Sequence, residues 1–425
     1  MRKAKVYLAS FLCISFLFAS GIVRAGTFYR EYWANWDPNI NNCSGRLRVN
    51  DTELSLHEEF GRRSEARANG LALMKVEEDI FGLESAELYL EMWGGHPGTA
   101  NKRFYLNGRQ AYQVPETGTA AGNCTYGYPK IPLKVGHLVQ GTNALQFVCD
   151  RGDSFWGHFI LDNAAIRCFL KPNHPELIRS GMERFSAQVE LADTSNSLND
   201  MVRVSLSYQD QFKDSIRSVD YFGRYFGFDD DGDGRDNGWH GYTQKRLPRN
   251  HIGTSSTAPF EVVWDTTMVP SQSGAMAIRA VVHLKNGLKY VTDTLDGLSF
   301  DAGRDRVEMY KCSEMPAPFW SRASRVSKAT INLPEDVGVI RRALLMVKIW
   351  DGGEGNVKEP FRINGIPYSI TSGKAIHDVV FTIAGIDPSN LRGGDNEITL
   401  VSDTEHHGIE VLLPGPVLIV RYGRR

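Results

Sequence analysis

The chain lacks the short motifs that identify many catalytic sites. It contains no G-x-S-x-G nucleophile turn, no H-E-x-x-H metal-binding pair and no glycine-rich phosphate loop. It has six cysteines but no C-x-x-C pair, which argues against a cysteine zinc site and against a redox motif. Basic residues form no block, so we expect no nucleic-acid partner.

Long apolar runs are also missing, with one exception at the N-terminus. Three basic residues precede the apolar stretch Val6–Ile22, and Val23–Ala25 has the small residues of a cleavage site. We therefore predict that residues 1–25 are a signal peptide and that the protein is secreted (extracellular, periplasmic or at the cell surface). Every other apolar run is shorter than the roughly 18 residues of a membrane-spanning helix.

Removal of this segment changes the charge and the set of cysteines. Four basic residues leave with it, so 44 of the 48 remain against 50 acidic residues, a net charge of −6. Five cysteines remain, an odd number that leaves at least one without a partner in the chain. Export permits disulfides, and Cys124 lies in the same predicted domain as two candidate partners, Cys149 and Cys168.

One stretch of the sequence occurs twice. At an offset of 257, Ala86–Gly108 and Ala343–Gly365 agree at eight of 23 positions, including a tryptophan, two glycines and the terminal Asn-Gly pair. Each copy predicts a hydrophobic strand, a glycine-rich turn after Trp93 or Trp350, and a second strand that ends in an Asn-Gly hairpin turn. The match continues beyond this turn, so we predict two homologous all-β domains.

The middle of the chain has its own strand pattern. Two prolines mark the linker Lys171–Pro175, and Asn286-Gly287 predicts a hairpin turn between two alternating strands. The segments Ser215–Gly223 and Ile252–Pro270 resemble bacterial immunoglobulin-like modules, in which a V-x-F/Y strand precedes G-T-x-T-x-A-P-[FY]-x-x-x-W-D-T. Such modules recur in secreted proteins that often act on polysaccharides or attach to them. This sequence departs from the pattern by an insertion at residues 226–248.

These features predict an all-β protein of three β-sandwich domains. Residues 26–170 form a jelly roll, residues 171–303 an immunoglobulin-like domain with an Asp-rich insertion, and residues 304–425 a second jelly roll. The outer two domains are predicted to be an internal repeat. They resemble galactose-binding-like jelly rolls, a fold common among carbohydrate-binding modules, in strand pattern and in the L-N-G…G-x-N-x-[IL] rhythm. This resemblance implies carbohydrate binding.

The insertion contains an acidic loop, FDDDGDGRDNGWHG, at Phe228–Gly241. Three alternating aspartates followed by Gly234 match the D-x-D-x-D-G opening of a calcium loop. His240 stands where an EF-hand has its last Glu, so the loop is not an EF-hand. Five Asp in eight residues would repel one another without a cation, so we expect a structural calcium site; the alternative is a solvated acidic turn. The candidate ligands are Asp229, Asp231, Asp233 and Asp236.

The repeat also supplies candidate glycan contacts. Trp93 and Trp350 occupy matching positions, and each is either a core aromatic specified by the fold or a stacking platform for a sugar ring. The loops between the last two strands of each copy carry acids and histidines that can exchange hydrogen bonds with hydroxyls; the alternative is a polar loop packed on the opposite sheet. The candidate ligand-binding residues are Trp93, Arg151, Asp153, Trp156, His158, Trp350, Glu405 and His407.

Three functions fit the sequence. We expect carbohydrate binding, because two similar sites on one chain give avidity for a repeating polysaccharide. The first alternative is a polysaccharide lyase or a glycoside hydrolase, in which His158 with Tyr126 or Tyr128 would supply the reacting groups. Glu405 with His407 is the other candidate pair, and no spacing identifies a catalytic residue. The second alternative is a structural or adhesion protein of a cell-surface assembly.

Overall fold

The computed structural model describes most of the chain. The described residues are 26–34, 47–49, 70–95, 99–109, 111–115, 125–150, 158–192, 196–321, 325–334, 339–351, 359–369, 378–401 and 408–423. The predicted signal peptide lies outside them. Nearly all regular structure in the described part is β-strand, which confirms the all-β prediction. None of its helices is both long enough and apolar enough to cross a membrane.

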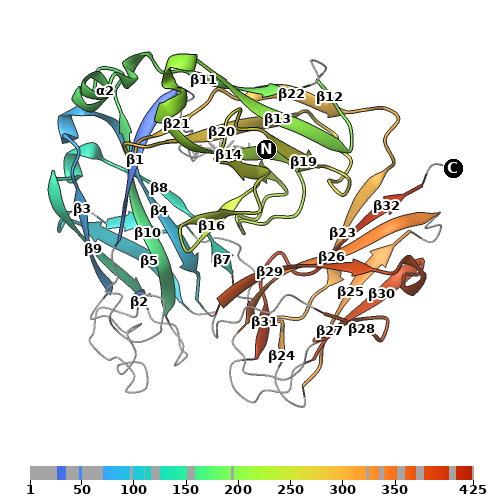
Figure 1. The fold of residues 1–425 in the computed structure, drawn as a ribbon. Helices are drawn as coiled ribbons and strands as arrows, with labels where there is room; N and C mark the ends of the chain where they lie inside the picture. The colour runs from blue at the N-terminus through green and yellow to red at the C-terminus, as the bar shows by residue number, and fades with distance from the viewer. Residues whose placement is uncertain are drawn as a thin grey trace, which may run out of the picture.

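The first region, residues 26–170, is a sandwich of two sheets (Figure 1). One sheet has the order β3-β9-β5-β6, and the other contains β1, β10 and β4 with β2, β7 and β8. Leu88, Leu90 and Met92 alternate along β4 into the core, and burial stabilises the fold by roughly 1.5–3 kcal/mol for each such side chain. The strands are Thr27–Trp33 (β1), Leu47–Val49 (β2), Leu71–Val76 (β3), Leu83–Trp93 (β4), Ala100–Leu106 (β5), Ala111–Gln113 (β6), Tyr126–Gly127 (β7), Lys130–Leu133 (β8), Gly141–Asp150 (β9) and Phe159–Leu170 (β10).

The middle region begins with a short helix, α2 (Pro175–Ser180), which ends at Gly181 with φ +69°. The sheet β11-β13-β19 packs against β20 and β22, and the predicted hairpin at Asn286-Gly287 joins β20 to β21. The strands are Ala187–Leu191 (β11), Ser197–Leu198 (β12), Met201–Tyr208 (β13), Ile216–Phe226 (β14), Asn237–Trp239 (β15), Tyr242–Gln244 (β16), Leu247–Arg249 (β17), Gly253–Ser255 (β18), Val262–Asp265 (β19), Met276–Leu284 (β20), Lys289–Val291 (β21) and Leu295–Phe300 (β22).

The third region has a core of its own, in which Leu345, Val347 and Ile349 alternate along β26. Strand β23 pairs with both β32 and β25 and so joins the two halves of this sandwich. The strands are Val307–Glu314 (β23), Trp320–Ser321 (β24), Ser327–Leu333 (β25), Ile340–Asp351 (β26), Phe361–Ile363 (β27), Ile366–Tyr368 (β28), Asp378–Ile386 (β29), Gly394–Leu400 (β30), Ile409–Val411 (β31) and Val417–Tyr422 (β32). Short 3-10 turns lie at Ile80–Gly82, Val135–His137, Met182–Arg184, Asp210–Ser215 and Pro388–Asn390 in the whole described chain.

The two outer regions pair their strands in the same way. Strand β4 pairs with β10 and β8 as β26 pairs with β32 and β29, and β9 pairs with β3 and β5 as β30 pairs with β25 and β27. The Asn of each Asn-Gly turn has a φ of +51°. Asn107 donates to Asn143 Oδ1 at 2.9 Å, and Asn364 donates to Asn396 Oδ1 at 2.9 Å. The common origin of the two regions stays a prediction that this agreement supports.

One sheet continues from the first region into the middle region. Strands β1 and β21 pair from Thr27 opposite Val291 to Tyr29 opposite Lys289. The sheet therefore has the order β12-β22-β20-β21-β1-β10-β4-β7, and one hydrophobic cluster spans both regions. The sequence suggested three separate sandwiches, whereas the first two share a sheet and a core. The division of the chain at residues 170 and 303 stays a prediction.

One of the two candidate disulfides is wrong. Cys168 is a free thiol with no exposed surface, because its side chain packs in the shared core. Cys124 lies outside the described residues, so a bond between Cys124 and Cys149 stays a prediction. Cys312 is also a free thiol.

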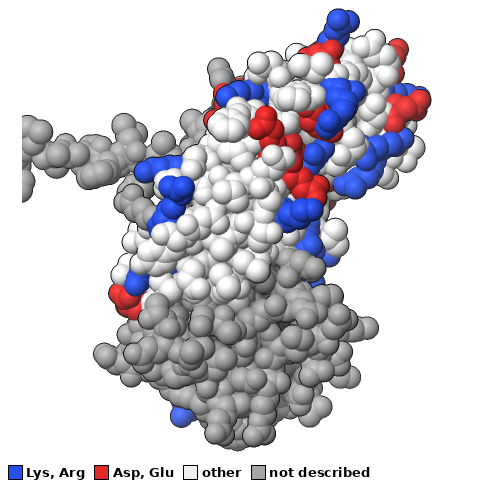
Figure 2. Space-filling view, turned by 90° about the vertical axis from the view of Figure 1, so that its left-hand side faces the viewer, with Lys and Arg blue, Asp and Glu red and all other residues white. Residues whose placement is uncertain are grey.

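Charges of both signs are mixed on the face shown in Figure 2. Lys and Arg side chains lie interspersed with Asp and Glu toward one end, and a broad area of uncharged surface lies beside them. On this face, the described residues form no large patch of a single sign.

Candidate functional site

The acidic loop brings three of its four candidate ligands together. Side-chain oxygens of Asp229, Asp231 and Asp233 lie within 4.8 Å of one another. Asp236 instead forms an ion pair at 2.5 Å with Lys311 of β23, in the third region. Three carboxylates thus converge, while calcium binding by any of the four aspartates stays a prediction.

Backbone hydrogen bonds fold this loop around Asp229. Its carboxylate oxygens accept from the backbone N–H groups of Asp233 at 3.1 Å and Gly234 at 2.8 Å. Gly232 and Gly234 have φ values of +70° and +84°, a conformation that favours glycine. A Cβ atom at Gly232 would lie 2.5 Å from the carbonyl oxygen of Tyr126, so the loop packs closely on the first region.

The converging carboxylates disfavour one another's charge. Burial, followed by the charge of Asp231, raises the pKa of Asp229 to about 7. Burial also raises the pKa values of Asp231 and Asp233, and a neighbouring carboxylate adds to each shift. Such a set of oxygens is suited to a hard divalent cation, which would stabilise the ionised forms.

Asp230 and His240 hold the loop in place. Asp230 accepts from the backbone N–H of Gly241 at 3.0 Å and from the side-chain amide of Asn250 at 2.7 Å. His240 Nδ1 lies 3.1 Å from Asp230 Oδ1, and Nε2 lies 2.9 Å from the carbonyl oxygen of Tyr225. Although burial lowers it, the hydrogen bond and charge of Asp230 raise the pKa of His240. The histidine that replaces the last EF-hand ligand therefore anchors the insertion to β14.

Lys348 joins the acidic loop to the third region. This β26 residue has no exposed surface, and its ammonium donates to the carbonyl oxygens of Asp230 at 2.9 Å and Tyr126 at 3.3 Å. The ring centroids of Tyr126, Tyr128 and Tyr242 lie 5.6, 4.8 and 4.8 Å from its nitrogen. Burial lowers the pKa of Lys348 to about 8. All three regions thus meet around one buried ammonium.

The two repeated tryptophans lie at this same junction. Trp93 is 7% exposed, and its ring centroid lies 5.4 Å from that of His158, which is also buried. Trp93 belongs to a buried cluster with Tyr126 and Tyr128, and Trp350 packs against that cluster. Protein atoms therefore cover Trp93, as expected for a core aromatic, and its ligand-binding role stays a prediction. The remaining candidate contacts lie outside the described residues: Arg151, Asp153, Trp156, Glu405 and His407.

Sequence analysis missed a second group of side chains, on the side of the shared sheet that faces away from the core. We call this side the outer face. Arg167 pairs with Glu31 at 2.8 Å and with Glu87 at 3.2 Å, and its guanidinium lies 3.9 Å from the centroid of Tyr89. Lys289 also pairs with Glu31. Although burial opposes the shift, Arg167 and Lys289 lower the pKa of Glu31 to about 2. The members of the outer face are Tyr29, Glu31, Trp33, Glu87, Tyr89, Glu91, Arg167, Arg279 and Lys289.

Two partly accessible tryptophans accompany this row of charges. Trp33, at the end of β1, meets Tyr89 edge-to-face at 6.0 Å, and the Arg246 guanidinium lies 5.4 Å from its ring. Trp239, on β15, lies 4.0 Å from the guanidinium of Arg279. Aromatic surface and fixed charge therefore occur together on the outer face.

The hairpin of β16 and β17 covers one end of the outer face. Glu91 is 1% exposed and accepts from Thr243 Oγ1 at 2.7 Å. It also accepts from the backbone N–H groups of Lys245 at 3.0 Å and Arg246 at 2.9 Å. Both of these residues have positive φ values, so one carboxylate holds the left-handed turn of the hairpin. The insertion is thereby fixed to β4.

A hydrogen-bonded chain of titratable groups lies farther along the same side of the sheet. Asp220 accepts from Thr254 Oγ1 at 2.7 Å, and its other oxygen lies 2.6 Å from His283 Nε2. His251 Nε2 lies 2.7 Å from Thr254 Oγ1. Although burial opposes the shift, the contact with His283 lowers the pKa of Asp220. This arrangement can orient an imidazole, as an acid–base group requires.

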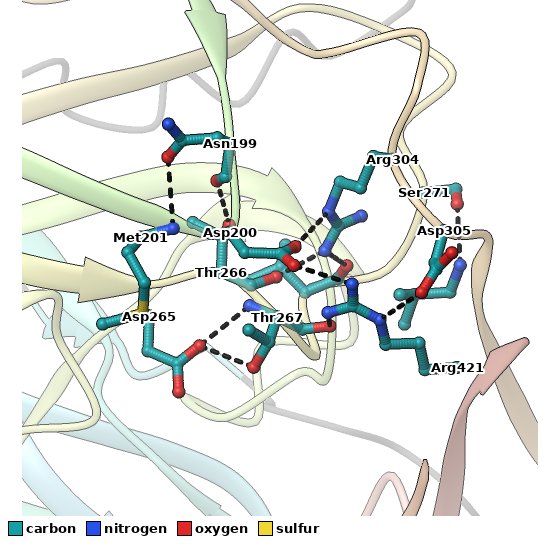
Figure 3. A network of polar contacts seen from close by, with 12 residues as sticks. Asn199, Asp200, Met201, Asp265, Thr266, Thr267, Ser271, Arg304, Asp305 and Arg421 are labelled. Atoms are coloured by element: carbon teal, nitrogen blue, oxygen red, sulfur yellow. Dashed lines mark hydrogen bonds and ion pairs between the residues drawn. The ribbon is translucent and has the colours of Figure 1, made fainter. Parts of the chain in front are cut away.

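A separate junction joins the middle and third regions (Figure 3). Arg421 of β32 forms ion pairs with Asp200 at 2.7 Å and with Asp305 at 3.1 Å, and it donates to the carbonyl oxygen of Thr267 at 3.2 Å. Arg304 donates to the carbonyl oxygens of Thr266 and Val269 beside the linker between the regions. A cavity of about 510 Å³ lies here, lined by Asn199, Asp200, Asp301, Gly303, Arg304, Asp305, Arg341 and Arg421. Its arginines and aspartates pair largely with one another, so this site fastens the two regions together.

The sequence carried a signal for the outer face. In β4, Leu88, Leu90 and Met92 alternate with Glu87, Tyr89, Glu91 and Trp93, so charged and aromatic side chains share the side away from the core. The same alternation runs along β1. Period-two spacing shows that these side chains share a face, but the partner strands that complete that face come from regions distant in sequence.

Comparisons with known proteins assign this chain to no family. No protein-family model matches it, and no curated protein matches it. Similar solved structures include a β-porphyranase of glycoside hydrolase family 86 from Bacteroides plebeius, with 15% identity, 56% of this chain and 36% of that chain covered, and a TM-score of 0.25. Fibronectin(III)-like modules of Clostridium thermocellum CbhA have 12% identity, 52% and 98% coverage, and a TM-score of 0.17.

A structure of carbohydrate-binding modules from the β-sandwich superfamily is also similar, with 11% identity, 56% and 92% coverage, and a TM-score of 0.16. The chain spans about a third of the length of the glycoside hydrolase of family 86 that it matches. At these identities and TM-scores, the similarities carry no argument about function.

Proposed function

We propose that this is a secreted carbohydrate-binding protein whose outer face binds an extracellular or cell-surface polysaccharide. The observation that supports this is the pairing of partly accessible tryptophan rings, at Trp33 and Trp239, with the charges fixed by Arg167. A sugar packs its C–H face on an aromatic ring, while carboxylates accept hydrogen bonds from its hydroxyls and guanidinium groups donate to them. Because ion pairs already hold these groups on a sheet, little freedom is lost on binding.

We further propose that the acidic loop binds a structural calcium ion through Asp229, Asp231 and Asp233. The three carboxylates fit such an ion because their oxygens converge and because, after burial, the charge of Asp231 raises the pKa values of Asp229 and Asp233. Two lysines lie near the loop: Lys348 donates to a backbone carbonyl, and Lys130 acts on Asp231 and Asp233 without forming an ion pair among the described residues. The ion would order the insertion, and with it the hairpin that covers the outer face. Asp236, paired with Lys311, remains a candidate only if that pair opens.

The test is a panel of polysaccharides incubated with the mature protein, with and without calcium. We expect retention of at least one glycan, without release of reducing ends or unsaturated products. Trp33→Ala and Trp239→Ala should each weaken binding by roughly 10-fold, in proportion to a lost stacking contact of about 1–2 kcal/mol. Phe81→Ala is the matched control, because Phe81 is an aromatic residue that is 89% exposed elsewhere. Binding unchanged in both tryptophan variants would contradict the placement of the site.

A polysaccharide lyase or glycoside hydrolase is the second candidate, and the pair of Asp220 and His283 is the observation that favours it. Release of products in the same panel would select this candidate. In that case His283→Gln should abolish the products and leave retention of the glycan unchanged. Neither retention nor products on any glycan would favour the structural or adhesion role.

A further inference from the structure

Arg279 is a cation on the outer face that forms no ion pair within the described part of the chain. It lies on β20 opposite Phe222 of β14, and its guanidinium stands 4.0 Å from the ring of Trp239. Its Nε atom is buried and has no hydrogen-bond partner, and no ion pair of Arg279 occurs among the described residues. A buried donor without an acceptor destabilises a protein, and a charged one does so most. Such a group therefore calls for an acceptor from outside the chain.

The neighbouring cations do not share this property. The guanidinium of Arg224 lies 5.5 Å from the same Trp239 ring, but it pairs with Asp296 at 2.7 Å. Arg167 has two carboxylate partners, as described above. Burial, aided by the charge of Arg167, lowers the pKa of Arg279 to about 10. The protein thus pairs its other arginines here with acids, whereas in the described part of the chain no carboxylate forms an ion pair with Arg279 and Glu87 acts on it only from a distance.

Lys130 is a second cation on the outer face. It lies on β8 opposite Tyr89 and has no ion pair in the described part of the chain. Desolvation by the neighbouring protein, followed by the charges of Arg279 and Arg167, lowers the pKa of Lys130, although Glu87 and Asp231 oppose the shift. Lys130, Arg279 and the partly accessible Trp239 ring thus lie on the same side of the sheet.

We propose that Arg279 binds the carboxylate or sulfate group of an acidic polysaccharide, with Trp239 beside the sugar ring and Lys130 as a further cation on the same face. This inference rests on the proposed function, because it names the class of glycan bound at the outer face. A guanidinium presents two parallel donors that match the oxygens of a carboxylate or sulfate. The indole beside it contacts the apolar side of the ring. A neutral glycan would leave the Arg279 guanidinium without an anionic partner.

The test measures the dissociation constants of the full mature protein for polygalacturonate, ι-carrageenan and the neutral galactomannan. Arg279→Gln should weaken binding of the acidic glycan by about 10- to 100-fold, the usual range for a lost charge-assisted hydrogen bond. Arg217→Gln is the matched control, because Arg217 is an exposed arginine on β14. Polygalacturonate and ι-carrageenan distinguish a carboxylate from a sulfate, and raised salt should weaken either complex.

A second readout separates binding from a structural role. Arg279→Gln should unfold within a few degrees of the wild-type protein, because the guanidinium loses only its contact with the Trp239 ring and relieves a buried donor without an acceptor. A lower unfolding temperature, together with equally weakened binding of all three glycans, would overturn the inference. Acidic glycan bound equally by Arg279→Gln and Arg217→Gln would overturn it too. If Arg279→Gln does not fold, Lys130→Gln replaces it, with the same expected loss of acidic glycan.

The remaining outcomes distinguish the inference of an acidic glycan from the proposed carbohydrate-binding function. Binding of galactomannan alone would refute the acidic class and leave the proposed function standing. Binding of none of these glycans, and of none in the wider panel, would refute both.

Discussion

Lys348→Met is a direct probe of the junction where the three regions meet. The wild-type ammonium has no contact with solvent, and it donates to the carbonyl oxygens of Asp230 and Tyr126. Methionine keeps a similar length and removes the charge and both donors. Two buried carbonyls then lose a partner, at about 1–3 kcal/mol for each. Removing the buried charge offsets this loss near neutral pH. Whether Lys348→Met stabilises or destabilises the protein therefore depends on pH.

The size of the pH effect follows from the shifted pKa. Lys348 has a pKa of about 8 in the folded protein, against 10.5 as the ordinary value. Below pH 8 the lysine is charged in both the folded and the unfolded state. Between pH 8 and pH 10.5 only the unfolded state keeps the proton, so the free energy of unfolding rises with pH. A difference of about 2.5 pH units corresponds to about 3 kcal/mol.

The assay is urea unfolding of both proteins, with a calcium chelator present, from about pH 7 to about pH 10.5. The free energy of unfolding of the wild-type protein should rise by about 3 kcal/mol relative to Lys348→Met, because all other titrating groups are shared. Lys285→Met, at an exposed position, controls for the loss of one positive charge. A difference between wild type and Lys348→Met that stays constant over this range would refute the reasoning.

Three further predictions address the repeat, the acidic loop and the second junction. Asn107→Ala and Asn364→Ala should each destabilise by about 3 kcal/mol, because each removes three matching hydrogen bonds; unequal losses in calorimetry would contradict their equivalence. Without calcium, stability should fall as pH rises from about 4 to about 7, since the pKa of Asp229 is raised in the folded state. Asp231→Asn should reduce this fall and abolish the calcium-induced rise in Tm. Arg421→Met should lower stability by about 2 kcal/mol and expose the linker at residues 301–306 to proteolysis, because two ion pairs are lost; unchanged cleavage would exclude a fastening role.

Several local features were predictable because their causes lie within a few residues. Asn107-Gly108 and Asn364-Gly365 form hairpin turns, since Asn and Gly tolerate the positive φ that such turns require. The D-x-D-x-D-G spacing brings alternate carboxylates to one point, because the loop turns at its glycines. These features depend only on backbone preferences and short-range hydrogen bonds.

The partner of Asp236 could not be predicted from the spacing of neighbouring residues. Spacing made it a fourth candidate ligand, but its carboxylate meets Lys311, which lies 75 residues away. Likewise, Trp93 and Trp350 suggested two separate sites, whereas both pack at one junction. Contacts between distant segments decide such cases, and no spacing within one segment encodes them.

By itself, the sequence determined the all-β character, the alternation that puts one side of each strand in the core, and the turns that end the strands. These are properties of single segments, set by period-two burial and by φ preferences. Only the tertiary structure decided that β1 would pair with β21 and so extend one sheet across two regions. It also decided that Lys348 would be buried against a loop more than a hundred residues away, and that Arg279 would form no ion pair with any described residue. Those outcomes depend on which surfaces meet, because charge, burial and accessibility are properties of the assembled fold.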